Sequence, residues 1–104
     1  MKNKDIINAF IEGQEEKVKN LFCKRDSFGR MVLFSYGEHF PLALKLDDCF
    51  VVNGNKYSQT TSCHQGILNR AIKGQKIIMV DTQKLKEIIG TDGKNESELI
   101  EVNI

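Results

Sequence analysis

Short apolar runs separated by turn residues fill the chain from residue 31 to residue 58, and this pattern constrains the fold most strongly. Residues 31–36 and 49–52 are apolar and rich in β-forming side chains, and apolar side chains alternate with others over residues 40–46. A period of two residues is typical of a strand with one buried face. The stretch therefore predicts a meander of antiparallel strands.

Two sequence signals refine this meander. The single proline, Pro41, indicates either a sheet edge or the first residue of a strand, because proline donates no hydrogen bond to a neighbouring strand. Asn53-Gly54 is the strongest hairpin signal in the chain, since both residues tolerate the positive φ angles of a two-residue turn. Residues 56–58 would then form the returning strand.

Apolar residues at helical spacing predict a first helix over residues 4–23, with Gly13 as the point where it could break. A second helix is expected over residues 62–73. Ser62 and Gln65 have the spacing of a capping box at the start of that helix.

The C-terminal third predicts a strand and a short helix. Residues 75–80 carry a continuous apolar run, which is typical of a buried strand. Asp81 would cap a helix that Gly90 ends. Residues 91–98 are polar and expected to be mobile, and the apolar residues of 99–104 would add an edge strand.

These elements predict one α+β domain over residues 1–104, with two to three helices on one face of a mainly antiparallel sheet of four or five strands. The length suits a single domain. No glycine-rich loop follows the strand at 75–80, so a dinucleotide-binding fold is not supported. No signal peptide or stretch of membrane-spanning length is found, so we expect no membrane partner.

The charges nearly balance, with 15 basic and 14 acidic residues, which argues against a dedicated polyphosphate binder. They are unevenly placed, because residues 1–30 hold seven basic and five acidic residues, whereas residues 77–104 hold three and six. The acidic C-terminal part is either ordinary solvated surface or a tail that docks on a basic partner.

The three cysteines show no close spacing and predict free thiols in a reducing, cytoplasmic environment. His39 and Cys49 could approach each other in space, but the chain contains no Cys-x-x-Cys or His-x-x-x-His spacing. We therefore expect no metal and no cofactor.

The polar stretch from residue 57 to residue 65 places four hydroxyl side chains at the apparent start of the second helix. A helix start offers unpaired N–H donors and a partial positive charge. The hydroxyl groups can cap the helix and pack the hairpin, or contact a nucleic-acid backbone with Lys56 and Arg70 while Tyr57 stacks on a base. Alternatively, Tyr57 and Arg70 anchor a protein interface. The three interpretations stay open at this point.

His64 is the one candidate for catalysis. Imidazole titrates near neutral pH, so it could act as a general base beside Ser58, Ser62 or Cys63. No acidic residue close in sequence would orient it, which favours a packing role. Cys63 and His64 are not a dyad, because adjacent helical residues point about 100° apart. We therefore expect no catalytic residue.

A resemblance to a known family rests on one motif, formed by Tyr57, Ser58, Thr60, Thr61, Ser62, His64 and Gln65. Looser matches are Ser35-Tyr36-Gly37, Pro41-Leu42-Ala43 and Asn53-Gly54-Asn55-Lys56. The chain resembles small uncharacterised proteins of phages, archaeal viruses and plasmids, which often read Tyr-Ser-x-Thr-Thr-Ser-x-His-Gln after a short hairpin. The resemblance covers about residues 31–73 and implies a mobile-element origin without a mechanism. Cys63 stands where the family often has a basic residue, which weakens phosphate binding.

We therefore expect a non-enzymatic binding protein of a phage or mobile element, located in the host cytoplasm. By analogy with anti-CRISPR proteins, it would inhibit a host defence nuclease by docking on it. Its partner would be a host protein or a protein–nucleic acid complex, with weak contact to nucleic acid. The expected contact residues are Tyr57, Thr60, Thr61, Ser62, His64, Gln65 and Arg70.

Two alternatives accompany this expectation. The first is a small nucleic-acid-binding protein that uses the helix start at 57–65 with Lys56, Arg70, Lys73 and Lys76. The second is a small hydrolase or nuclease that uses His64.

Overall fold

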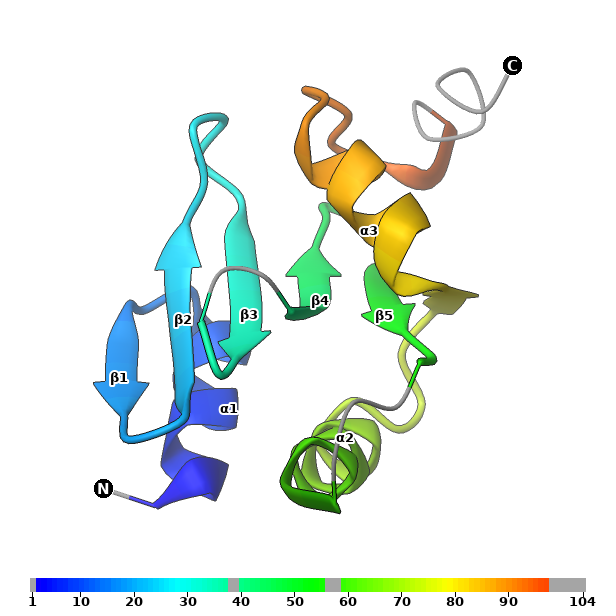
Figure 1. Cartoon of the computed structure of the whole chain (residues 1–104). Coiled ribbons are helices and arrows are strands. Elements are labelled where there is room, and N and C mark those ends of the chain that lie inside the picture. The colour runs from blue at the N-terminus through cyan, green and yellow to red at the C-terminus, as the bar shows by residue number, and fades with distance from the viewer. Residues whose placement is uncertain (1, 38–39, 56–58, 98–104) are drawn as a thin grey trace.

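The computed structural model describes residues 2–37, 40–55 and 59–97, apart from the side chain of Thr60 (Figure 1). In chain order, the elements are α1 (Asn3–Glu12), β1 (Glu16–Val18), β2 (Leu21–Arg25), β3 (Met31–Ser35), β4 (Pro41–Lys45), β5 (Phe50–Asn53), α2 (Gln59–Ala71), β6 (Ile77–Val80) and α3 (Thr82–Ile89).

The six strands form one mixed sheet whose spatial order, β1 to β6, follows the sequence. Strands β1 to β5 pair antiparallel, and β6 pairs parallel to β5 because α2 carries the chain back to the starting end. The α+β prediction is confirmed. The sheet is mainly antiparallel, as predicted, but the described residues form six strands and not four or five, and one strand pair is parallel.

Both faces of the sheet carry apolar side chains, and the helices are divided between them. Helices α1 and α2 pack on the face that includes Leu33 and Leu42, whereas α3 packs on the face that includes Val32 and Leu44. The prediction of helices on one face is therefore wrong. The buried strands β3 to β5 present apolar residues at successive positions, so each face needs a cover.

The first predicted helix is only half as long as expected. Helix α1 ends at Gly13, whose φ of 82° is left-handed, so the predicted break is confirmed. The rest of the predicted helix forms β1 and most of β2, which continues to Arg25. Leu21 and Cys23 are buried at alternate positions, as a strand requires.

Pro41 has one of its two predicted roles, whereas Asn53-Gly54 does not form the predicted hairpin turn. Pro41 begins β4, which confirms the strand-start interpretation, and β4 lies between β3 and β5 and not at an edge. Strand β5 has β4 on one side and β6 on the other, so no hairpin can follow Asn53. Neither Asn53 nor Gly54 has a positive φ. Residues 56–58 lie outside the described residues.

The capping box predicted at Ser62 and Gln65 is wrong, because α2 already includes Gln59. Strand β6 lies at the sheet edge, with Ile77 and Met79 exposed by 37% and 59%, so the prediction of a fully buried strand is also wrong.

Helix α3 begins and ends as predicted. The carboxylate of Asp81 accepts a hydrogen bond from the Lys84 N–H at 2.7 Å, and the helix stops before Gly90. The predicted capping by Asp81 is therefore confirmed.

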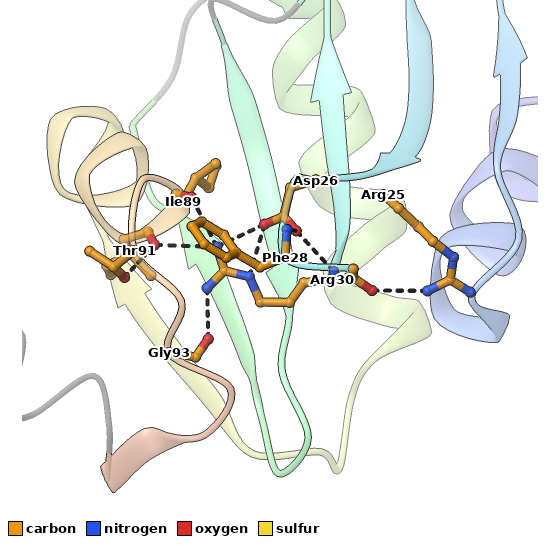
Figure 2. Close-up of polar contacts among 9 residues, drawn as sticks. Arg25, Asp26, Phe28, Arg30, Ile89, Thr91 and Gly93 are labelled. Atoms are coloured by element: carbon orange, nitrogen blue, oxygen red, sulfur yellow. Dashed lines mark hydrogen bonds and ion pairs between the residues drawn. The ribbon is translucent and has the colours of Figure 1, made fainter.

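Arg30 ties the segment after α3 to the loop between β2 and β3, as Figure 2 shows. Its guanidinium donates hydrogen bonds to the Gly93 carbonyl at 2.7 Å and the Ile89 carbonyl at 2.9 Å, and it pairs with Asp26 at 2.7 Å. The mobility of residues 91–98 stays a prediction, although Gly93 within this segment is held by Arg30. The strand expected over 99–104 lies outside the described residues.

In the described part of the chain, no helix combines the length and the apolar character needed to cross a bilayer.

Candidate binding face

The predicted contact surface on α2 lies largely inside the molecule. Thr61, His64 and Gln65 are exposed by only 0%, 1% and 7%, Ser62 is half-buried, and Arg70 is exposed. Tyr57 and the side chain of Thr60 lie outside the described residues. The prediction of a docking surface is therefore wrong for Thr61, His64 and Gln65, because this side of α2 packs against the sheet.

His64 belongs to a buried polar cluster that joins α2 to β3. The Ser35 hydroxyl lies 3.0 Å from Nδ1 of His64 and 3.3 Å from the hydroxyl of Thr61, and Ser35 is itself fully buried. Burial lowers the pKa of His64, which favours the neutral imidazole. A general base must reach its substrate. This enclosed cluster therefore supports a packing role and gives the hydrolase hypothesis no site.

The side-chain amide of Gln65 is used by backbone carbonyls at the end of β5. Its amide donates to the carbonyls of Asn53 at 3.1 Å and Asn55 at 2.6 Å. The Asn53 amide in turn donates to the Pro41 carbonyl at 2.8 Å and the Thr82 hydroxyl at 2.9 Å. These polar groups hold β5, α2 and the start of α3 together, so they are not available to a partner.

The cysteines are free thiols, as predicted. Burial raises the pKa of Cys23, and burial with a hydrogen bond to Asp48 raises the pKa of Cys49 to about 12, so neither forms a reactive thiolate. Cys63 is exposed. Among the described residues, no group of three or more His, Cys, Asp or Glu side chains could hold a metal ion.

The sheet has an open area on the side where α3 packs. Helix α3 contacts β4 and β5 on this side, and Figure 1 shows α1 behind β2 and β3 with no described helix in front of them. Lys17, Phe22 and Lys24 line this open area, and the buried ring of Phe34 on β3 packs against Phe22; we call these four side chains the lysine–phenylalanine face.

Aromatic stacking and lysine contacts organise the lysine–phenylalanine face. Phe22 and Phe34 are directly paired across β2 and β3, and their rings stack with centroids 5.1 Å apart and planes inclined by 20°. The Lys17 ammonium lies 6.0 Å from the centre of the Phe22 ring, and that of Lys24 lies 5.9 Å from Phe34. Such cation–π contacts place positive charge directly over flat rings.

Two acidic residues close in sequence, Glu15 and Glu16, line the hollow beside Lys17 and Lys24, and Glu15 offsets part of the positive charge there. The Glu15 carboxylate accepts a hydrogen bond from the Arg25 backbone N–H at 2.9 Å. Glu16 pairs with Cys23 in the strand register and so lies on the opposite side of the sheet. The lysine–phenylalanine face therefore combines an aromatic stack with net positive charge.

Comparison of the chain with protein-family models, curated proteins and solved structures finds no match. The resemblance to small phage proteins therefore stays a prediction, and function must be argued from the residues of the face.

The face was not predicted from the sequence, because residues 16–23 were assigned to the helix expected over residues 4–23. On a helix, Phe22 and Lys24 would point in different directions, whereas in a strand they share one side. The signal was present, since Leu21 and Cys23 alternate with Phe22 and Lys24 after the break at Gly13.

Proposed function

We propose that this protein is a non-enzymatic binding protein that contacts nucleic acid through the lysine–phenylalanine face. The observation that carries the proposal is the stacked pair Phe22 and Phe34, flanked by Lys17 and Lys24 on the uncovered part of the sheet. Lysine ammonium groups attract phosphates, and aromatic rings stack on bases whatever their sequence.

The composition of the face favours nucleic acid over a protein partner. Aromatic side chains are common at both kinds of interface, but lysine is depleted at protein–protein interfaces and is a principal phosphate contact. The proposal keeps the nucleic-acid-binding alternative that the sequence suggested, but with a different contact surface. Of the four basic residues of that alternative, Lys56 lies outside the described residues and Lys76 pairs with Glu96, while Arg70 and Lys73 are exposed.

Fluorescence anisotropy with labelled oligonucleotides tests the proposal. We expect binding that weakens steeply between about 50 mM and about 200 mM salt, because phosphate contacts release counterions. The Lys17→Ala/Lys24→Ala variant should lose most of this affinity. The matched control Lys73→Ala/Lys86→Ala removes the same charge from exposed positions elsewhere and should bind like the wild type. Equal losses in both variants would contradict a specific face.

A second candidate function is the one that the resemblance implies, a phage protein that docks on a host defence nuclease and inhibits it. Exposed Phe28 and Tyr36 favour it, because aromatic residues are enriched in protein interfaces. A pull-down from nuclease-treated host lysate tests it. A nuclease retained by the wild type and lost with Phe28→Ser/Tyr36→Ser supports docking, whereas no retained nuclease counts against it.

A further inference from the structure

We infer that the nucleic acid bound by this face is a single strand that runs along β2, from Tyr36 towards the loop between β2 and β3. This inference rests on the proposed function and adds to it the form of the nucleic acid and its path.

Three shallow hollows adjoin one another along β2. The first, about 250 Å³, is lined by Lys17, Lys19, Phe22 and Tyr36 among others. The second, about 380 Å³, shares Lys17 and Phe22 with the first and adds Lys24 together with the acidic Glu15 and Glu16. The third, about 220 Å³, shares Lys24 with the second and adds Phe34 and the acidic Asp26. Because neighbouring hollows share side chains, they form one continuous path.

The path has the length of a short single strand. It follows β2 from Asn20 to Asp26, which at about 3.3 Å per residue is roughly 20 Å. This is room for about three extended nucleotides, close to the smallest sites of single-strand-binding domains. Lys17, Lys19 and Lys24 line it together with the acidic Glu15, Glu16 and Asp26, so the three lysines are the candidate phosphate contacts.

The accessibility of the rings explains why the strand must be single. Phe34 is exposed by only 6% and supports Phe22 from one side, whereas Phe22 is half-buried and presents the ring that a base can reach. In a duplex the base faces are covered by neighbouring base pairs, so they cannot stack on a side chain. An unpaired base can extend the two-ring stack at Phe22.

When the strand binds, Lys17 exchanges its contact with the Phe22 ring for a contact with a phosphate. The Lys17 ammonium lies over Phe22 at 6.0 Å. A base that stacks on Phe22 takes its place, and the ammonium group turns to the adjacent phosphate, which is a stronger partner than the ring. The three lysines make about three phosphate contacts, for which the expected slope of log K against log salt is about −2.

A tryptophan reporter tests the stacking step directly. The chain contains no tryptophan, so Phe22→Trp introduces a single fluorophore into the stack. Oligothymidylate and oligouridylate should quench its fluorescence, whereas a blunt hairpin duplex of equal phosphate content should not. The control Met79→Trp places the fluorophore on exposed β6, and neither nucleic acid should quench it.

Two further variants separate stacking from charge. Phe22→Leu keeps an apolar side chain without the ring and should lose about tenfold in single-strand affinity with an unchanged salt slope. Lys17→Ala/Lys24→Ala removes two phosphate contacts and should make the slope shallower by about 1.4. Circular dichroism confirms that each variant is folded.

The outcomes distinguish this inference from the proposed function. Equal affinity for duplex and single strand, or undiminished single-strand affinity in Phe22→Leu, overturns the single-strand inference and leaves nucleic-acid binding standing. Failure of the wild type to bind either form overturns the proposed function itself.

Discussion

Two buried polar side chains, Arg30 and His64, join segments that lie far apart in the chain. Arg30 is exposed by 6%, and its guanidinium reaches Asp26, Ile89 and Gly93 (Figure 2). A buried charge is tolerated only when it is paired and its donors are used. Both side chains therefore stabilise the fold through all their partners at once, and their loss leaves those partners unsatisfied.

Replacement of Arg30 by methionine tests whether the buried contacts of this arginine stabilise the fold. The Oδ2 atom of Asp26 and the carbonyls of Ile89 and Gly93 would lose their side-chain donor, so we expect the free energy of unfolding to fall by about 3–5 kcal/mol. Urea denaturation measures it. The control Arg25→Met removes an exposed guanidinium and should cost about 1 kcal/mol or less. Similar losses in both variants would show that the buried pairing adds nothing.

The buried imidazole of His64 predicts a pH dependence of stability. Burial lowers the pKa of His64 in the folded state, so the unfolded chain takes up a proton at a higher pH than the folded chain does. Stability should therefore decrease as the pH falls below about 6.5, until the lowered folded pKa is reached, and should not change through His64 above that range. Urea midpoints from pH 8 to pH 5 measure the effect; a His64→Gln variant with the same profile would contradict it.

At the scale of elements, two glycines have opposite roles in helices. Gly13 ends α1 with a φ of 82°, where an alanine side chain is strained, so Gly13→Ala should destabilise the protein by about 1 kcal/mol. Gly66 lies within α2, and a Cβ there would meet no atom within 4 Å. Gly66→Ala should therefore stabilise by about 0.5–1 kcal/mol, because alanine favours the helix. Thermal unfolding of both variants checks the signs; a destabilised Gly66→Ala would refute the argument.

Strand β6 forms an exposed sheet edge with apolar side chains on it. Such edges can pair with another chain and lead to aggregation. Met79→Lys should slow aggregation on heating, while its long aliphatic stem still covers Gly54 and keeps stability within about 0.5 kcal/mol. Light scattering measures the aggregation rate. The control Gln83→Lys adds the same charge on α3, and an equal effect there would point to net charge and not to the edge.

Local signals in the sequence predicted several elements correctly. The cap at Asp81, the breaks at Gly13 and Gly90 and the strands over the meander depend on neighbouring residues, so the sequence contains them. Residues 16–23 were predicted wrongly as helix because the same apolar residues fit a helical period and a period of two. The pairing of β6 with β5 was not predictable, since α2 separates the two strands.

The candidate site was predictable only in part. The hydroxyl residues before His64 suggested an exposed helix start, but exposure depends on which side of α2 the sheet covers. The apolar residues of α2 alone do not fix this, because Ser35 lies 29 residues before His64 and forms the deciding contact. The lysine–phenylalanine face required the strand assignment of β1 and β2, without which its residues do not meet.

At the scale of the whole molecule, the sheet separates binding from internal packing. The lysine–phenylalanine face lies on the side where α3 packs, and His64 lies in α2 on the other side. Substitutions at distant sites that share no partners change the free energy of unfolding independently of each other. The Lys17→Ala/Lys24→Ala variant should therefore keep the pH profile of its urea midpoint while nucleic-acid affinity falls. A shifted profile would show that the two sides of the sheet are coupled.

The contacts of Arg30 also have a consequence for synthesis on the ribosome. Translation delivers the N-terminal hairpins first, whereas the carbonyls of Ile89 and Gly93 emerge only after most of the chain. Until then the arginine must stay hydrated, and the loop that carries it cannot close. A nascent or prematurely terminated polypeptide is thus left open to proteases at this loop.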